Sequence, residues 1–234
     1  MTFQEFDTYL KESLEIGLSE VQKEQFQTYL SMLQEWNRLF NLTAVTDEVQ
    51  IIEKHFLDSL LPLKYISIQG RRLLDIGSGA GFPGIVWAIV NPCSMITLLE
   101  PNNKKARFLH AVVERIKLNN VTVVVGRAEA QLAWRDKFDI AVARAVKSLS
   151  IILELAIPLL KVEGCFIAMK SQGVDQEIAS AKKAFALLNC QVQERHLDVL
   201  PSDKDVRINL FIVKSDNTPN RYPRPYNLIS AKPL

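Results

Sequence analysis

The chain has 234 residues, of which 48% are hydrophobic and 23% are charged. This composition supplies one core of ordinary size and excludes a disordered chain, a collagen-like fibre and a small disulfide-stapled fold. The longest apolar run, residues 151–160, contains Glu154 and Pro158 and is too short to span a membrane. The N-terminus lacks a basic stretch followed by an apolar segment, so we expect no signal peptide.

The three cysteines lie far apart without a C-x-x-C spacing, which predicts reduced thiols and a cytoplasmic protein. The three histidines show no metal-ligand spacing, so we expect no metal. The net charge of +2 divides into −6 over residues 1–70 (5 Lys/Arg against 11 Asp/Glu) and +8 over residues 71–234 (23 against 15). The basic body predicts an anionic partner, although a chance imbalance of solvated faces would give the same count.

Residues 1–70 are predicted to form an N-terminal helical subdomain. Ser19 and Gln22 match a capping box, and apolar residues follow them at helical spacing. A second helix is predicted to begin at Asp47 and to bury Phe56 on its apolar face.

Residues 71–214 alternate short apolar runs with helical patterns, which predicts an α/β fold with a doubly wound, mostly parallel sheet. Strands are expected at Arg72–Ile76, Met95–Glu100, Val121–Val125, Asp139–Ala143 and Cys165–Met169, and helices at Phe82–Asn91, Asn102–Leu118, Ser148–Leu160 and Asp175–Leu188. Two more strands, Gln191–Leu200 and Val206–Lys214, follow each other without a helix, which predicts an antiparallel hairpin. Residues 215–234 are basic and contain four prolines, so we expect an extended C-terminal tail.

A glycine-rich turn after the first predicted strand is the most informative segment for chemistry. It reads Asp75-Ile-Gly77-Ser-Gly79-Ala-Gly81-Phe-Pro-Gly84. Glycines allow a sharp turn and the close approach of a ligand to the backbone. Glu100 ends the next strand, where a carboxylate can accept hydrogen bonds from a ribose diol.

Two classes of cofactor fit this turn. A nicotinamide dinucleotide site needs G-x-G-x-x-G, which the chain matches from Gly79 onward. S-adenosylmethionine enzymes instead place an acid two positions before G-x-G-x-G, as Asp75 stands before Gly77. A buried carboxylate repels a pyrophosphate and attracts the ammonium of a methionine moiety, so S-adenosylmethionine is favoured. A purely structural tight turn is the third interpretation.

Several further motifs together resemble the RsmG (GidB) family of bacterial methyltransferases. They are Asn41-Leu-Thr-Ala-Val-Thr46, His55-Phe-Leu-Asp-Ser-Leu60, the glycine turn, Lys105-Ala-Arg-Phe-Leu109, Arg127-Ala-Glu129, Phe138-Asp-Ile-Ala-Val-Ala-Arg-Ala145 and the Pro-Arg-Pro…Lys-Pro-Leu ending. The resemblance implies a class I, Rossmann-like methyltransferase that uses S-adenosylmethionine. The implied reaction is methylation of guanine N7 in 16S ribosomal RNA of the small subunit.

By this resemblance the cofactor contacts fall on Gly77, Gly79, Gly81, Phe82, Ala128, Glu129 and Arg144, with Asp75 and Glu100 beside them. Arg144 is expected to position the reactants without a general base, because guanine N7 carries a lone pair and no proton. Basic residues at Lys147, Lys170, Arg221 and Arg224 are expected to hold the RNA. The expected partner is 16S ribosomal RNA or the small ribosomal subunit, and no membrane.

Two rival functions remain open from the sequence. One is a nicotinamide-dependent oxidoreductase, and the other is a non-catalytic RNA-binding module on the same fold. Cofactor binding distinguishes the first rival, and methyl transfer to RNA distinguishes the second.

Overall fold

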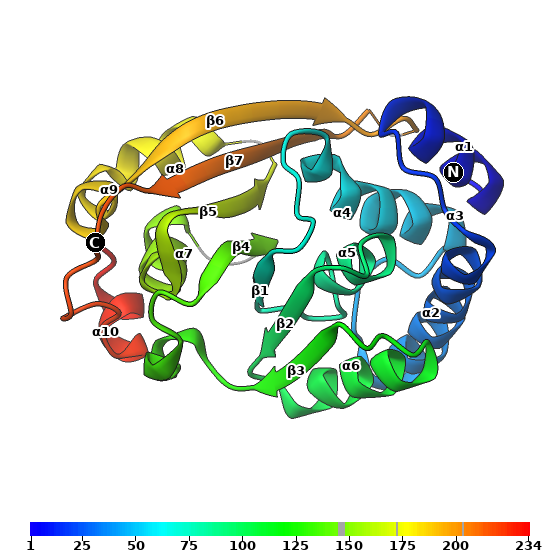
Figure 1. Ribbon diagram of the computed structural model, residues 1–234, viewed down its shortest axis with the longest axis horizontal. Helices are drawn as coiled ribbons and strands as arrows, with labels where there is room; N and C mark the ends of the chain where they lie inside the picture. The colour runs from blue at the N-terminus through cyan, green and yellow to red at the C-terminus, as the bar shows by residue number, and fades with distance from the viewer. Residues whose placement is uncertain (145–147, 172, 203) are drawn as a thin grey trace.

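The computed structural model describes residues 1–144, 148–171, 173–202 and 204–234. Within them, a sheet of seven strands has the order β3-β2-β1-β4-β5-β7-β6 (Figure 1). The strands are β1 (Arg72–Ile76), β2 (Met95–Glu100), β3 (Val121–Val125), β4 (Phe138–Arg144), β5 (Leu160–Lys170), β6 (Cys190–Val199) and β7 (Val206–Lys214). Strands β1 to β5 run parallel, and β7 is antiparallel to both β5 and β6. The predicted sheet with its terminal hairpin is confirmed.

Helices cover both faces of this sheet. The α-helices are α1 (Phe3–Ser13), α2 (Glu20–Phe40), α3 (Glu48–Ile51), α4 (Asp58–Leu60), α5 (Gly84–Val90), α6 (Asn103–Arg115), α7 (Leu149–Ala156), α8 (Val174–Ser180), α9 (Lys182–Leu188) and α10 (Tyr226–Ala231). A π-helix, η1 (Ile52–Leu57), precedes α4, and the 3₁₀ turns are η2 (Leu61–Lys64), η3 (Ala128–Ala130), η4 (Leu132–Trp134) and η5 (Ile157–Leu159).

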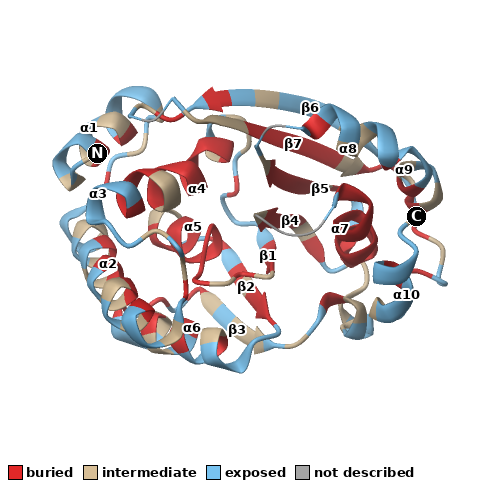
Figure 2. Cartoon of the chain, turned by 180° about the vertical axis from the view of Figure 1, so that it is seen from behind, coloured by how far each residue is buried: buried red, intermediate tan, exposed pale blue. Residues whose placement is uncertain are grey.

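Alternate residues of each strand enter two different cores, as the pleat of a strand requires. Leu73 of β1 packs in a cluster with the helices α2, α5 and α6, whereas its neighbour Leu74 packs in a second cluster with α7 and α9. Buried residues accordingly concentrate in the middle strands and in α4, α5 and α7, while the outward side of β6 is exposed (Figure 2).

The N-terminal helices share the first of these cores with the sheet. Phe26 of α2 packs against Phe6 of α1 and Phe56 of η1, with ring centroids 5.4 and 5.1 Å away. Tyr29 donates a hydrogen bond of 2.6 Å from Oη to the carbonyl of Ala80 in the glycine turn. The helices of residues 1–70 are thus continuous with the core of the sheet.

Several predicted boundaries are wrong, each for a local reason. The helix expected at 148–160 ends at Ala156, and Pro158 lies in the 3₁₀ turn that follows, since proline cannot donate the next helical hydrogen bond. Strand β5 therefore starts at Leu160 rather than Cys165. The helix expected at 175–188 is divided at Ala181 into α8 and α9.

The C-terminal tail is not fully extended, which corrects the prediction. Residues Tyr226–Ala231 form the short helix α10, which packs on α7 near one end of the molecule (Figure 1). Its Ile229 is fully buried. Tertiary contact, which a single-sequence pattern does not report, orders this segment.

Candidate active site

The glycine turn has the backbone that its sequence predicts. Gly77, Gly79 and Gly81 have φ angles of +73°, +59° and +102°, in the left-handed region that favours glycine. A Cβ on Gly81 would lie 2.6 Å from Ile85 and 2.8 Å from the Tyr29 hydroxyl, whereas one on Gly79 would meet nothing closer than 3.8 Å. The turn is therefore packed on its inner side and open at Gly79.

Two buried carboxylates hold this turn. Glu100 accepts hydrogen bonds of 2.8 Å from the N–H groups of Gly79 and Asn102, one on each oxygen. Oδ2 of Asp75 accepts one of 3.0 Å from the Gly84 N–H. Burial raises the pKa of Asp75 to about 7.

The second oxygen of Asp75, Oδ1, is buried and has no hydrogen-bond partner among the described residues. A buried acceptor without a donor is unusual in folded proteins. A methionine ammonium supplies both the donors and the positive charge that this carboxylate lacks. Together with the open side of Gly79, this fits S-adenosylmethionine better than the pyrophosphate of a nicotinamide cofactor.

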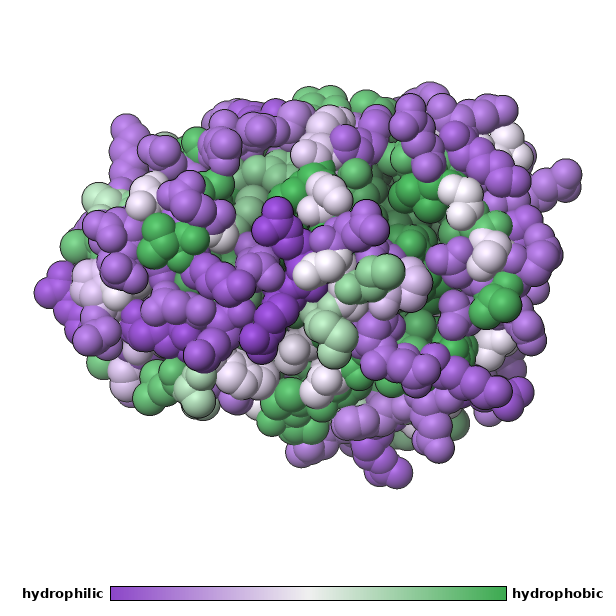
Figure 3. Space-filling view, viewed as in Figure 1, coloured by the Kyte–Doolittle hydropathy of each residue, from purple (hydrophilic) through white to green (hydrophobic). Residues whose placement is uncertain are grey.

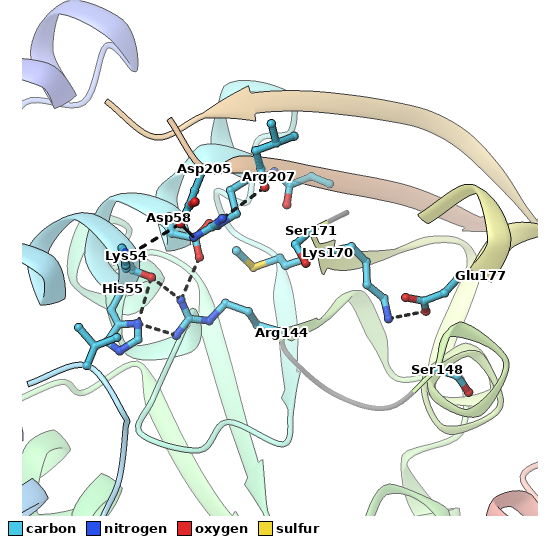
Figure 4. A pocket seen from close by; sticks show the side chains of 14 residues that line it. Lys54, His55, Asp58, Arg144, Ser148, Lys170, Ser171, Glu177, Asp205 and Arg207 are labelled. Atoms are coloured by element: carbon cyan, nitrogen blue, oxygen red, sulfur yellow. Dashed lines mark hydrogen bonds and ion pairs between the residues drawn. The ribbon is translucent and has the colours of Figure 1, made fainter. Parts of the chain in front are cut away.

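Arg144, the last residue of β4, is held on several sides (Figure 4). Nη1 donates 3.1 Å hydrogen bonds to the Lys54 carbonyl and to Oδ2 of Asp58. Its guanidinium also lies over the ring of Phe82, 4.9 Å from the centroid. These contacts bring a basic side chain to Phe82, which directly follows Gly81 in the glycine turn.

His55 links Arg144 to the segment between α2 and α3. Its ring stacks on Phe82 at 4.6 Å, Nδ1 lies 3.3 Å from Nη2 of Arg144, and Nε2 lies 2.7 Å from Oγ1 of Thr43. Nδ1 also lies 3.0 Å from the Lys54 carbonyl, which is closer than Arg144 and can only accept. We therefore assign Nδ1–H as the donor to Lys54 and Nε2 as the acceptor from the Thr43 hydroxyl. Burial and the charge of Arg144 lower the pKa of His55 to about 3. The imidazole is therefore neutral at physiological pH.

Asp58 binds two guanidiniums from strands that lie far apart in the sequence. Its Oδ2 pairs with Arg144 and its Oδ1 accepts a 3.1 Å hydrogen bond from Nε of Arg207 in β7. Burial raises the pKa of Asp58, and the two arginines oppose that effect. One carboxylate thus fixes the arginines of β4 and β7 relative to each other.

A cleft of about 870 Å³ opens beside these residues, at the carboxyl ends of β4 and β5. Figure 4 shows Arg144 and Lys170 on neighbouring strands, with Arg144 pointing toward His55 and Asp58, and Lys170 pointing away from Arg144 toward Glu177. The lining residues are Val45, Lys54, His55, Asp58, Arg144, Ser148, Met169, Lys170, Ser171, Glu177, Asp205, Val206, Arg207 and Asn209. Hydrophilic side chains cover most of the face seen in Figure 3, and apolar ones show mainly in recesses between them.

The structure brings some of the predicted site residues together and separates others. Lys170 lines the cleft and pairs with Glu177 at 2.8 Å. Ala128 and Glu129 form η3 just after β3, at the same edge of the sheet. Lys147 lies outside the described residues.

The two predicted tail arginines lie with the C-terminal segment. Arg224 binds the fully buried carboxylate of Glu154 through its backbone N–H, Nε and Nη2, at 2.6–2.9 Å. This pairing argues against the expected contact of Arg224 with RNA. Arg221 is exposed and stacks on Tyr222.

Lys54, His55, Asp58 and Arg207 were not predicted as site residues. The first three belong to or adjoin the His55-Phe-Leu-Asp-Ser-Leu60 motif, which was noted only as a family resemblance. The sequence offered one indication of a site here. Lys54, His55 and Asp58 place two basic residues and an acid within five positions, on a segment whose apolar face is buried. Nothing in the sequence around Arg207 marks it.

Two other features were sought within the described part of the chain. No group of three or more His, Cys, Asp or Glu residues there is arranged to hold a metal ion. None of the helices described there is long and apolar enough to cross a membrane.

Known proteins with similar structures share the fold. TYW2 of M. jannaschii in complex with AdoMet superposes with a TM-score of 0.57 at 15% identity, over 73% of this chain and 79% of that one. Fibrillarin of Aeropyrum pernix, with natively bound S-adenosyl-L-methionine, gives 0.51 at 16%, over 67% and 73%. The predicted class I methyltransferase fold is confirmed.

Sequence relatives are much closer. The ribosomal RNA small subunit methyltransferase G of Streptococcus pyogenes serotype M5 is 41% identical over the whole of both chains. That of Streptococcus equi subsp. zooepidemicus is 43% identical over 93% of this chain and 94% of the relative. The sequence model of the GidB family, described as rRNA small subunit methyltransferase G, matches residues 22–202.

These relatives confirm an enzyme that uses S-adenosylmethionine and give no support to the nicotinamide alternative. The resemblance noted in the motifs extends over more than three quarters of the sequence, including the glycine turn, His55 and Arg144. The chain belongs to the rRNA small subunit methyltransferase G family.

Proposed function

We propose that this protein transfers a methyl group from S-adenosylmethionine to N7 of a guanosine in 16S ribosomal RNA, in the cytoplasm. The observation that carries the proposal is the place of Arg144. It lies between Phe82, next to the glycine turn, and a cleft lined by Lys54, Lys170 and Arg207. A cationic cleft beside a methyl-donor site suits an RNA strand better than a small neutral substrate.

The residues at the cleft suit a reaction without a general base. The bound cofactor supplies an electrophilic methyl group on a sulfonium. N7 attacks the methyl carbon with its lone pair, and the electrons of the breaking bond go to sulfur. His55 is neutral and both of its nitrogens are engaged, so it moves no proton. Arg144 orients the reactants, and catalysis is mainly positioning.

Specific contacts follow from this proposal. The residues that contact the cofactor are Gly77, Gly79, Gly81, Phe82, Ala128, Glu129 and Arg144. Asp75 attracts the cofactor's ammonium group, and Glu100 accepts hydrogen bonds from its ribose. Each oxygen of Glu100 retains a lone pair beyond its bond to a backbone N–H. Lys170 faces the RNA. In this proposal residues 1–70 form the helical subdomain, residues 71–214 the methyltransferase core and residues 215–234 the tail.

The methylated atom is tested with labelled cofactor. We expect tritium to pass from methyl-labelled S-adenosylmethionine to 16S RNA or to small ribosomal subunits. N7-methylguanosine is cationic and open to borohydride reduction, so aniline should then cut the product at one guanosine. A methyl group recovered on an exocyclic nitrogen, in RNA that resists this scission, would contradict the mechanism.

The cofactor site is tested with two glycine variants of matched strain. Gly79 and Gly70 both have positive φ, +59° and +69°, and both have room for a Cβ. We expect Gly79→Val to abolish calorimetric binding of S-adenosylhomocysteine and Gly70→Val to leave it unchanged. Equal losses in both variants would mean that backbone strain, rather than a blocked site, is responsible.

A further inference from the structure

Two cations of the cleft meet the same carboxylate oxygen. Nζ of Lys54 in η1 lies 3.8 Å from Oδ2 of Asp205, and Nη2 of Arg207 in β7 lies 3.7 Å from that oxygen. Asp205 precedes β7 in the hairpin loop, and 46% of its side chain is exposed. Both contacts are ion pairs that are too long for hydrogen bonds.

Arg207 is fixed in place by other groups. Its Nε is bound to Asp58, and its Nη1 donates to the Val206 carbonyl at 3.3 Å. Its Nη2 makes no hydrogen bond within the described ranges and faces Asp205. An oriented guanidinium with an unused donor is a ready anion site.

Asp205 is held less firmly than the cations. Its carbonyl accepts a hydrogen bond from the Leu200 N–H at 3.0 Å, but its carboxylate accepts none from the residues that the structure describes. The carboxylate can therefore turn towards solvent without breaking a hydrogen bond. Asp58 binds both Arg207 and Arg144. An anion in the place of the Asp205 carboxylate therefore lies in the same cleft as Arg144, beside the methyl-transfer site.

We propose that Lys54 and Arg207 bind a phosphodiester group of the RNA next to the target guanosine, and that Asp205 occupies this site until RNA displaces it. The proposal rests on the proposed function. The three cations Lys54, Arg144 and Arg207 and the two carboxylates Asp58 and Asp205 together carry a net charge of +1. Without Asp205 the same group carries +2, which favours an RNA phosphate.

Asp205→Asn tests this proposal because it should strengthen binding. We expect the affinity for a fluorescent RNA of the target loop to rise about fivefold at low salt, as removing one like charge implies. The gain should shrink at high salt. Affinity for S-adenosylhomocysteine should stay the same.

Asp216→Asn is the matched control, since it makes the same change in an exposed residue beyond the other end of β7. Equal tightening in both variants would mean a general charge effect and would overturn the site. Unchanged or weaker RNA binding by Asp205→Asn would overturn it too. In a Lys54→Gln background, which removes one of the two cations, the gain from Asp205→Asn should fall to twofold or less.

Methyl transfer by the wild-type enzyme to the same RNA separates the two proposals. If wild type methylates the RNA and Asp205→Asn binds no tighter, only the phosphate site fails. If wild type binds but does not methylate, the proposed function fails, and the Asp205→Asn affinity still decides the phosphate site.

Discussion

At the scale of single residues, the orientation of Arg144 depends on groups that do not react. Thr43 is the most remote of them. The side-chain amide of Asn37, at the end of α2, holds the backbone of Thr43. Oδ1 of Asn37 accepts from the Thr43 N–H at 2.8 Å, and Nδ2 donates to the Thr43 carbonyl at 2.9 Å. The Thr43 hydroxyl then donates to Nε2 of His55, and Nδ1–H of His55 donates to the Lys54 carbonyl, which also accepts from Nη1 of Arg144. A hydrogen-bonded chain thus runs from a helix end to the guanidinium.

Thr43→Val should therefore lower kcat by roughly tenfold, the effect of losing one hydrogen bond worth about 1.5 kcal/mol. KM for the cofactor should change little. Thr43→Ser should restore the rate, and the exposed Thr46→Val should have no effect. The ¹⁵N shift of Nε2 in His55 should change in Thr43→Val alone, because that nitrogen loses its hydrogen-bond partner; an unchanged shift with a lowered rate would point to a packing defect.

Two of the buried titratable groups, Asp75 and His55, should affect stability in opposite directions. Asp75 has a raised pKa, so the native state binds more protons than the unfolded state between pH 3.8 and about 7, and stability falls as the pH rises. His55 has a lowered pKa, so the unfolded state binds more protons between about 3 and 6.5, and stability rises there. In the wild-type protein the two contributions partly cancel.

Asp75→Asn should separate these contributions. Relative to the variant, the wild-type protein should lose up to about 4 kcal/mol of unfolding free energy between pH 4 and pH 7. Urea denaturation at a series of pH values measures this difference. A constant difference across the series would show that the Asp75 carboxyl titrates normally.

At the scale of elements, η1 places three of the four site residues that the sequence did not assign: Lys54 and His55 within it, and Asp58 directly after it. In this π-helix the N–H of Asp58 bonds to the carbonyl of Glu53, five residues earlier. A π-turn adds a residue to the helical turn and is often found at functional sites. Here the π-turn lets one segment do two things. Phe56 is buried in the core, and the Lys54 carbonyl and the side chains of His55 and Asp58 contact Arg144.

An ion pair between Arg224 and Glu154 ties the C-terminal element to α7, beside the apolar contact of Ile229. Arg224→Ala would leave the carboxylate of Glu154 buried without its partner, which should destabilise the protein by about 3 kcal/mol. Arg221→Ala, which removes an exposed cation, should cost less than about 0.5 kcal/mol. If Arg224 binds RNA instead, its variant should keep its thermal stability and lose RNA affinity.

At the scale of the whole molecule, the N-terminal helices and the sheet should unfold together. Phe6 is fully buried and contacts Phe26 and Phe56, which belong to the core shared with α5 and α6. Phe6→Ala should therefore cost about 3–5 kcal/mol and shift a single unfolding transition. Val21→Ala, at a position 65% exposed, is the control. Two separate transitions would mean that residues 1–70 fold independently.

The sequence by itself determined the α/β alternation, the terminal hairpin and the glycine turn. These features depend on local properties: hydrophobic period, the need for positive φ at Gly77, Gly79 and Gly81, and an acid two positions before the turn. The place of Arg144 followed as well, because it directly follows the predicted strand Asp139–Ala143; in the structure it is the last residue of β4. The family motifs then indicated S-adenosylmethionine as the cofactor and methyl transfer to guanine N7 as the reaction.

Only the tertiary structure decided the walls of the cleft and the order of the tail. Asp58 and Arg207 are 149 residues apart in the chain, and Arg224 and Glu154 are 70 apart. Neither pairing leaves a local pattern, because charged residues on a helix or strand look the same whether they face solvent or each other. Packing of η1 and the hairpin around β4 brings the first pair together, and burial of Glu154 in α7 selects Arg224 for the second.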